Sequence, residues 1–216
     1  MSDTFDLPVE RFTQRDNKYI DPITKKNVAG VSCFPTSIAM CETYIIEKVE
    51  GKDKAAVGCA PDMQLEDYIN AMADDPISQK WLKENVSKLG QWITGVPHRT
   101  LYDLEAFNAN RLMNPLGYKA SFQILKYEQI CDKLEETKLP MVIGGNFSSI
   151  CAVQGHMLCC RGFNKIGSPE FILNDPYGNA LKKYVDDNGG DGARYPIKYF
   201  FKDSAQNMYV IVFEIA

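Results

Sequence analysis

Three residue types that can together break an amide bond occur in this chain in a fixed order. Cys33 opens the segment Cys-Phe-Pro-Thr-Ser, His156 follows a glycine, and Asp175 precedes a proline. A cysteine thiolate can attack a carbonyl carbon, an imidazole can carry the proton, and a carboxylate can orient the imidazole. The order Cys, His, Asp therefore indicates nucleophilic acyl transfer, provided that the fold brings the three side chains together.

Cys33 is the strongest candidate for the nucleophile because it stands at the start of a predicted helix. Ser32 is predicted to cap this helix, and Pro35 falls in its first turn, where a missing N–H costs nothing. At that end the helix dipole favours the thiolate over the thiol. The chain has seven cysteines, and the other six are predicted in the core, in a loop, or in or beside helices and strands: Cys41, Cys59, Cys131, Cys151, Cys159 and Cys160.

The choice of a general base is narrow because the chain has two histidines. His98 is predicted to be an exposed residue in a loop before a helix, whereas His156 begins a predicted strand. A histidine at a strand start is more often structural than catalytic, so both interpretations of His156 stay open. Strand alternation places His156 and Cys160 on one face, but this pair matches no zinc-binding spacing. We therefore predict no metal site.

Asp175 also has two interpretations that stay open at this stage. The segment Asp-Pro-Tyr-Gly is typical of a type I turn, with Asp first, Pro second and Gly fourth. Asp175 also ends the predicted strand that follows the strand of His156, 19 positions after the histidine. Two neighbouring strands with this separation can place the carboxylate beside the imidazole, where it would fix the tautomer and stabilise the imidazolium.

Motifs of other enzyme classes are missing from the sequence. Residues 145–148 read Gly-Asn-Phe-Ser and do not match the G-x-S-x-G elbow of serine hydrolases. The glycines within 189–192 form neither a P-loop nor a dinucleotide-binding motif. The thiol chemistry itself needs no metal and no organic cofactor, and we predict none.

The composition predicts a folded protein that binds neither nucleic acid nor a membrane. The chain has 216 residues, 45% of them hydrophobic and 24% charged, which suits one large domain. A net charge of −4 and a pI of about 5.3 argue against phosphate backbones and anionic lipid as partners. The acidic N-terminal residues resemble no signal peptide, and no run approaches the roughly 18 apolar residues of a membrane span. The odd cysteine count predicts reduced thiols and a cytoplasmic protein, with export by another route left open.

The elements that must position these residues form a helical part followed by a sheet. Residues 1–32 are expected to be extended or looped, 33–49 helical, and 62–125 mostly helical, on apolar spacings of three and four. A further helix is predicted over 128–137, and 186–192 is predicted to be a solvated loop. Strands rich in Val, Ile, Tyr and Phe are predicted over 139–144, 157–163, 171–173, 195–201 and 208–213. This layout is an α+β fold with an antiparallel sheet.

Taken together, these blocks resemble the papain-like cysteine peptidases of the C39-like family. That family has a glutamine near the start, then a Cys-Gly-Pro-Thr-Ser-type helix start, then Gly-His before a strand, then Asp-Pro. This chain has Gln14, followed by Cys33, His156 and Asp175 in the matching blocks, so the resemblance spans residues 14 to about 201. It implies a papain-like α+β fold with Cys33 as nucleophile, His156 as base and acid, and Asp175 as the orienting carboxylate. It further implies that Gln14 supplies an amide to the oxyanion hole, beside the backbone N–H of Cys33.

The chain departs from the family pattern in two places. Phe34 stands where the family usually has glycine, and we expect this side chain either to fill a pocket or to narrow the cleft. Residues at about 50–125 form a helical insertion within a single domain of residues 1–216, and we expect the insertion to influence the choice of substrate.

The resemblance implies a cysteine hydrolase that cleaves peptide or isopeptide bonds through an acyl-enzyme. Two alternatives stay open: a lytic peptidoglycan endopeptidase or amidase, which shares this chemistry, and a non-catalytic binding module on the same fold. The presence of Cys, His, Asp and Gln together counts against the binding module, because a site without catalytic activity has no physical need for all four.

Overall fold

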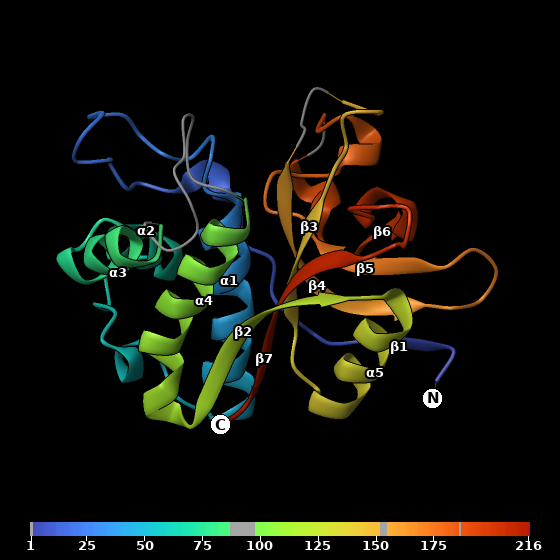
Figure 1. Cartoon of the computed structure of the whole chain (residues 1–216), viewed down its shortest axis with the longest axis horizontal. Coiled ribbons are helices and arrows are strands. Elements are labelled where there is room, and N and C mark those ends of the chain that lie inside the picture. The colour runs from blue at the N-terminus through green and yellow to red at the C-terminus, as the bar shows by residue number, and fades with distance from the viewer. Residues whose placement is uncertain (1, 87–97, 152–154, 186) are drawn as a thin grey trace.

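A seven-stranded antiparallel sheet is the framework on which the helices pack (Figure 1). The computed structural model describes residues 2–86, 98–151, 155–185 and 187–216. The strands are β1 (Thr4–Asp6), β2 (Tyr118–Leu125), β3 (Met141–Gly145), β4 (His156–Asn164), β5 (Glu170–Asn174), β6 (Ala193–Pro196) and β7 (Met208–Ile215). They follow the order β2-β7-β3-β4-β5-β6, and β1 pairs with the C-terminal end of β4. The N-terminal segment is thereby tied to the strand that begins with His156.

Five α-helices cover the sheet in the described part of the chain. They are α1 (Cys33–Thr43), α2 (Leu65–Ala73), α3 (Pro76–Val86), α4 (His98–Met113) and α5 (Tyr127–Thr137). Figure 1 shows α1–α4 gathered on the left of the molecule and α5 on the right, below β6. None of the helices described is both long and apolar enough to cross a membrane.

The hydrophobic core has two layers, one on each face of the sheet, because successive strand residues point to opposite faces. On one face, side chains of α1, α2 and α4 pack against Val142, Cys159 and Ile211. On the other face, α5 packs against the alternate residues Ile143, Leu158 and Val210. This alternation confirms the strand reading of β4 and shows why its apolar residues form an almost continuous run.

Helix α1 lies deep within the first layer. Every residue from Phe34 to Glu42 is buried, and the helix continues into a wider turn over Tyr44–Val49. The Ser37 hydroxyl donates a hydrogen bond to the carbonyl of Met157 over 3.0 Å, which joins α1 to the start of β4. The predicted helix over 33–49 is therefore confirmed, and its first residue is held rigidly beside His156.

The α+β fold predicted from the sequence is confirmed, but one long segment was assigned wrongly at its end. We expected 62–125 to be mostly helical, whereas Tyr118–Leu125 forms strand β2. This strand pairs with β7 along its whole length, from Tyr118 opposite Ile215 to Leu125 opposite Met208. Pairing and burial on one face outweigh local propensity here, as is common in strands.

Two smaller expectations in the last third also need correction. The strand expected over 195–201 ends at Pro196, and Ile197–Phe200 forms a 3-10 turn instead. Proline lacks the N–H that a ladder requires, so a strand end at this point is expected on physical grounds. In the predicted loop 186–192, residues Asp187–Gly190 form a 3-10 turn, and residue 186 lies outside the described residues.

Candidate active site

The structure brings the four predicted site residues together at the junction of α1 and the sheet. Cys33 is the first residue of α1, and His156 is the first residue of β4. Asp175 follows directly after β5, which pairs antiparallel with β4. Gln14 begins a 3-10 turn, Gln14–Asp16, and its backbone N–H donates to the carbonyl of Pro176 over 2.9 Å.

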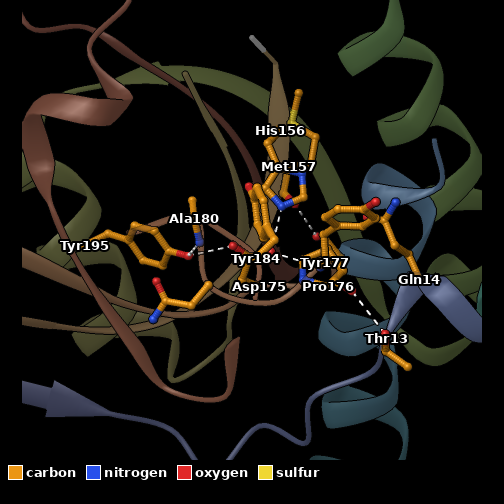
Figure 2. A network of polar contacts seen from close by, with 12 residues as sticks. Thr13, Gln14, His156, Met157, Asp175, Pro176, Tyr177, Ala180, Tyr184 and Tyr195 are labelled. Atoms are coloured by element: carbon orange, nitrogen blue, oxygen red, sulfur yellow. Dashed lines mark hydrogen bonds and ion pairs between the residues drawn. The ribbon is translucent and has the colours of Figure 1, made fainter. Parts of the chain in front are cut away.

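His156 and Asp175 form a buried hydrogen-bonded pair. Nε2 of His156 lies 2.7 Å from Oδ1 of Asp175, and the two side chains are 4% and 0% exposed. Two further groups donate to the same carboxylate: the Tyr177 backbone N–H at 2.9 Å and the Tyr195 hydroxyl at 2.6 Å (Figure 2). Because Asp175 occupies Nε2, the imidazole nitrogen left for another partner is Nδ1.

The Cys33 thiol is the second group that influences the ionisation of His156. Burial raises the pKa of the thiol, but the hydrogen bond and the positive charge of His156 outweigh this, so the pKa of Cys33 lies below its ordinary value of 9.0. Burial lowers the pKa of His156, but the charge and hydrogen bond of Asp175, together with Cys33, raise it to about 10. The arrangement thus favours a thiolate–imidazolium ion pair at neutral pH.

Asp175 satisfies both of its sequence interpretations. The N–H of Gly178 donates to the carbonyl of Asp175, which closes the predicted turn, while the side chain reaches His156. The turn is held from outside as well, since Nε of Arg11 donates to the Asp175 carbonyl and the Asp175 N–H donates to the Gly190 carbonyl. A Cβ added at Gly190 would come within 2.5 Å of the Asp175 carbonyl oxygen, so only glycine fits this close approach.

Gln14 lines a cavity whose wall also includes Cys33 and His156. The cavity has a volume of about 300 Å³ and includes Tyr177 and Tyr184 in its wall. Gln14 is 2% exposed, and its Nε2 donates one hydrogen bond to the carbonyl of Ala29 over 2.8 Å. An amide nitrogen carries two hydrogens, so the second is free to donate to a ligand in this cavity.

Two tyrosines that sequence reasoning did not single out complete the surroundings of the pair. The Tyr195 hydroxyl accepts a hydrogen bond from the Ala180 N–H at 2.9 Å and donates to Asp175. The Tyr184 ring packs edge-on against the imidazole of His156, with ring centres 5.9 Å apart (Figure 2). Tyr195 reaches Asp175 because β6 pairs with β5, and no local sequence signal carries that register.

Some of the predicted surroundings differ in the structure. Ser32 precedes α1 as expected, but its hydroxyl donates to the carbonyl of Val28 and does not cap the helix. The side chain of His98 lies outside the described residues, although its backbone begins α4. All seven cysteines are free thiols, and Cys33 and Cys151 are the two that are partly accessible. The described residues contain no cluster of three or more metal-binding side chains.

Comparison with models of protein families gives a match over most of the chain. The model of the Peptidase_C39 like family matches residues 6–197, which include all four site residues. No curated protein matches the chain.

Proposed function

The chain belongs to the Peptidase_C39 like family, and on that premise we propose that it hydrolyses peptide or isopeptide bonds with Cys33 as the nucleophile. One observation carries the proposal: His156 is held by Asp175 at Nε2 and shares a cavity wall with Cys33, whose pKa it lowers. The family supports a cysteine peptidase in general terms. The roles of the individual residues are our inference from the geometry.

The first half of the proposed reaction forms an acyl-enzyme. The Cys33 thiolate attacks the carbonyl carbon, a C–S bond forms, and the π electrons move onto the carbonyl oxygen. The His156 imidazolium then gives its proton to the leaving nitrogen, the C–N bond breaks, and an amine departs. A thioester on Cys33 and a neutral imidazole remain.

The second half releases the acid. Neutral His156 takes a proton from a water molecule, and the resulting hydroxide attacks the thioester carbon. Collapse of this intermediate breaks the C–S bond, gives a carboxylic acid and regenerates the thiolate–imidazolium pair. Asp175 keeps Nε2 of the ring engaged throughout, so the imidazole cannot rotate away from the thiol.

The negative charge that develops on the carbonyl oxygen in both halves needs hydrogen-bond donors. We assign this role to the second Nε2 hydrogen of Gln14 and to the backbone N–H of Cys33, which has no intrahelical partner because it opens α1. Both donors are fixed before substrate binds, because Gln14 is buried and anchored to Ala29 and Pro176. Preorganised donors of this kind stabilise the transition state without a reorganisation cost.

The test compares the two partly accessible cysteines, Cys33 and Cys151, in their reaction with iodoacetamide at pH 6. An ordinary thiol is almost fully protonated at this pH and reacts slowly. We expect peptide mapping by mass spectrometry to show Cys33 modified at least about tenfold faster than Cys151, and His156→Ala to abolish the difference. Equal rates at the two cysteines, or an unreactive Cys33, would refute the proposed function.

A further inference from the structure

A second cavity adjoins Cys33 on the side of the helical insertion, and its wall is acidic. Its volume is about 510 Å³, within the range of pockets that bind small ligands. We call it the acidic pocket; its wall includes Asp21, Cys33, Asp74, Tyr102, Glu105 and Met157. Of the described residues, no lysine or arginine lines it. The pocket therefore presents three carboxyl groups next to the proposed nucleophile.

Two of these carboxyl groups are already satisfied by the protein. Asp21 accepts hydrogen bonds from the backbone N–H groups of Ile23 and Thr24 in its own turn. Asp74 accepts a hydrogen bond from the Tyr19 hydroxyl over 2.8 Å. Their remaining influence on the pocket is a negative electrostatic potential, with Lys25 near Asp21 as a partial counter-charge.

Glu105 differs from both because it is buried and one of its oxygens has no hydrogen-bond partner among the described residues. The residue is 7% exposed, and the oxygen without a partner is Oε2. A buried carboxyl group without a partner is costly, and such groups are normally paired with a cation or a hydrogen-bond donor. A group that is left unsatisfied in the wall of a pocket points to a ligand that supplies the missing donor.

The neighbouring buried carboxyl group does not supply it. Glu42 on α1 also lacks partners for both of its oxygens among the described residues. Burial above all, and then the charge of Glu105, hold the pKa of Glu42 well above its ordinary value, so Glu42 stays protonated. Burial raises the pKa of Glu105 to about 7, so at neutral pH an approaching cation can draw Glu105 into its charged form.

We propose that the acidic pocket binds a cationic side chain of the substrate, a primary ammonium or guanidinium group, through Glu105. This inference rests on the proposed function, and it adds a substrate class: peptides or isopeptides with a basic residue close to the scissile bond. The pocket touches Cys33 and also Met157, the residue that follows His156, so a side chain bound there belongs to a residue at or next to the reacting carbonyl. Glu105 lies in α4 and Asp74 directly follows α2, so it is the helical insertion that sets this preference.

The test uses peptidyl acyloxymethyl ketones, which alkylate a thiolate with loss of a carboxylate. Two matched sets carry lysine or norleucine at the first or second residue before the ketone, and the rate of Cys33 labelling is measured by mass spectrometry. We expect the better lysine probe to label the wild-type protein at least about tenfold faster than its norleucine match. Glu105→Gln should remove most of this preference while the norleucine rate and the iodoacetamide rate at Cys33 stay unchanged.

A matched control is available in Glu66→Gln. Glu66 is 4% exposed, and burial raises its pKa to about 7 as well, but it lies outside the acidic pocket. This variant should keep the lysine preference. Equal labelling by lysine and norleucine probes in wild type, or equal losses in Glu105→Gln and Glu66→Gln, would overturn the proposal. If Glu105→Gln fails to fold, the wild-type comparison alone still decides.

The failure of this proposal is distinguishable from failure of the proposed function. Iodoacetamide is small and uncharged, so its reaction with Cys33 reports on the thiolate and not on the acidic pocket. A protein that reacts selectively with iodoacetamide but shows no lysine preference keeps its function and loses the pocket assignment.

Discussion

The Tyr195 hydroxyl lies 2.6 Å from Oδ2 of Asp175, so both oxygens of this carboxylate have a fixed partner. Tyr195 does not touch the space where substrate binds, and it acts on the reaction through Asp175 and His156. It is therefore a positioning residue, and its hydroxyl also satisfies the buried N–H of Ala180.

Tyr195→Phe should lower both stability and kcat. Loss of the hydroxyl leaves the Ala180 N–H and one oxygen of Asp175 without a partner, which costs about 1–3 kcal/mol for each buried group. The measurement is urea unfolding together with kcat and KM. We expect kcat to fall several-fold with little change in KM, because the carboxylate loses its fixed orientation.

Tyr127→Phe is the matched control for this prediction. Tyr127 is buried and donates to the carbonyl of Asn164 over 3.0 Å, far from the site. It should lower stability and leave kcat unchanged. An equal loss of kcat in both variants would mean that Tyr195 is only structural.

The pH dependence of kcat/KM should report the thiolate–imidazolium pair. The rate should rise with pH as the Cys33 thiol ionises, at a pH below its ordinary pKa of 9.0. It should fall again near pH 10, where His156 loses the proton that it must donate. The check is a profile of kcat/KM from pH 4 to about 11, over the range in which the protein stays folded.

Asp175→Asn should move the alkaline limb of this profile to lower pH. Asp175 supplies the charge that raises the pKa of His156, whereas burial lowers it, so without the charge the imidazolium is lost at lower pH. The negative charge of Asp175 also raises the pKa of Cys33, so its removal should move the acid limb to lower pH as well. An alkaline limb that stays near pH 10 in this variant would contradict the assignment of Asp175.

Gln14→Ala should separate peptide hydrolysis from thiol reactivity. Removal of one oxyanion donor typically costs a hundredfold or more, so kcat should fall by about a hundredfold. Alkylation of Cys33 by iodoacetamide involves no oxyanion, and its rate should be unchanged. Wild-type turnover in this variant would exclude Gln14 from the oxyanion hole.

Gly190→Ala should distort the turn that holds Asp175, although Gly190 is not itself one of the candidate catalytic residues. The added Cβ would meet backbone oxygen atoms of Asp175 and Gly178 at 2.5 and 2.7 Å, and backbone cannot move aside as a flexible side chain can. We expect a loss of about 1–3 kcal/mol in the free energy of unfolding, together with lower activity. Gly30→Ala is the stability control, because no atom lies within 4 Å of its Cβ position. Unchanged stability of Gly190→Ala in urea unfolding would contradict this packing.

The positions of the candidate catalytic residues could be predicted because local rules place them. A helix start fixes Cys33, a strand start fixes His156, and a turn after the next strand fixes Asp175. The meeting of these three residues in space depends on the pairing of β4 with β5 and on the packing of α1. The resemblance to a family predicted this meeting, whereas the periodicity of the sequence alone did not.

Other parts of the site could not be predicted, for a physical reason. Tyr195 reaches Asp175 through the register of β6 on β5, and Glu105 reaches the acidic pocket through the packing of α4 against α1. Neither register nor helix packing leaves a short motif in the sequence. Strand β2 was missed because its apolar residues alternate imperfectly, and only its eight-residue pairing with β7 decides its conformation.

The hydrogen bond between Ser37 and Met157, and that between Gln14 and Pro176, have a consequence for how the protein becomes active. Ser37 and Met157 are 120 positions apart in the chain, so the site consists of early and late segments that meet only in the folded state. Such non-local contacts form slowly and late. During synthesis, Cys33 leaves the ribosome long before its histidine does, and until that partner folds against it the thiol stays an ordinary, weakly reactive one. The topology itself thus delays the meeting of Cys33 and His156 until β4 has folded against α1.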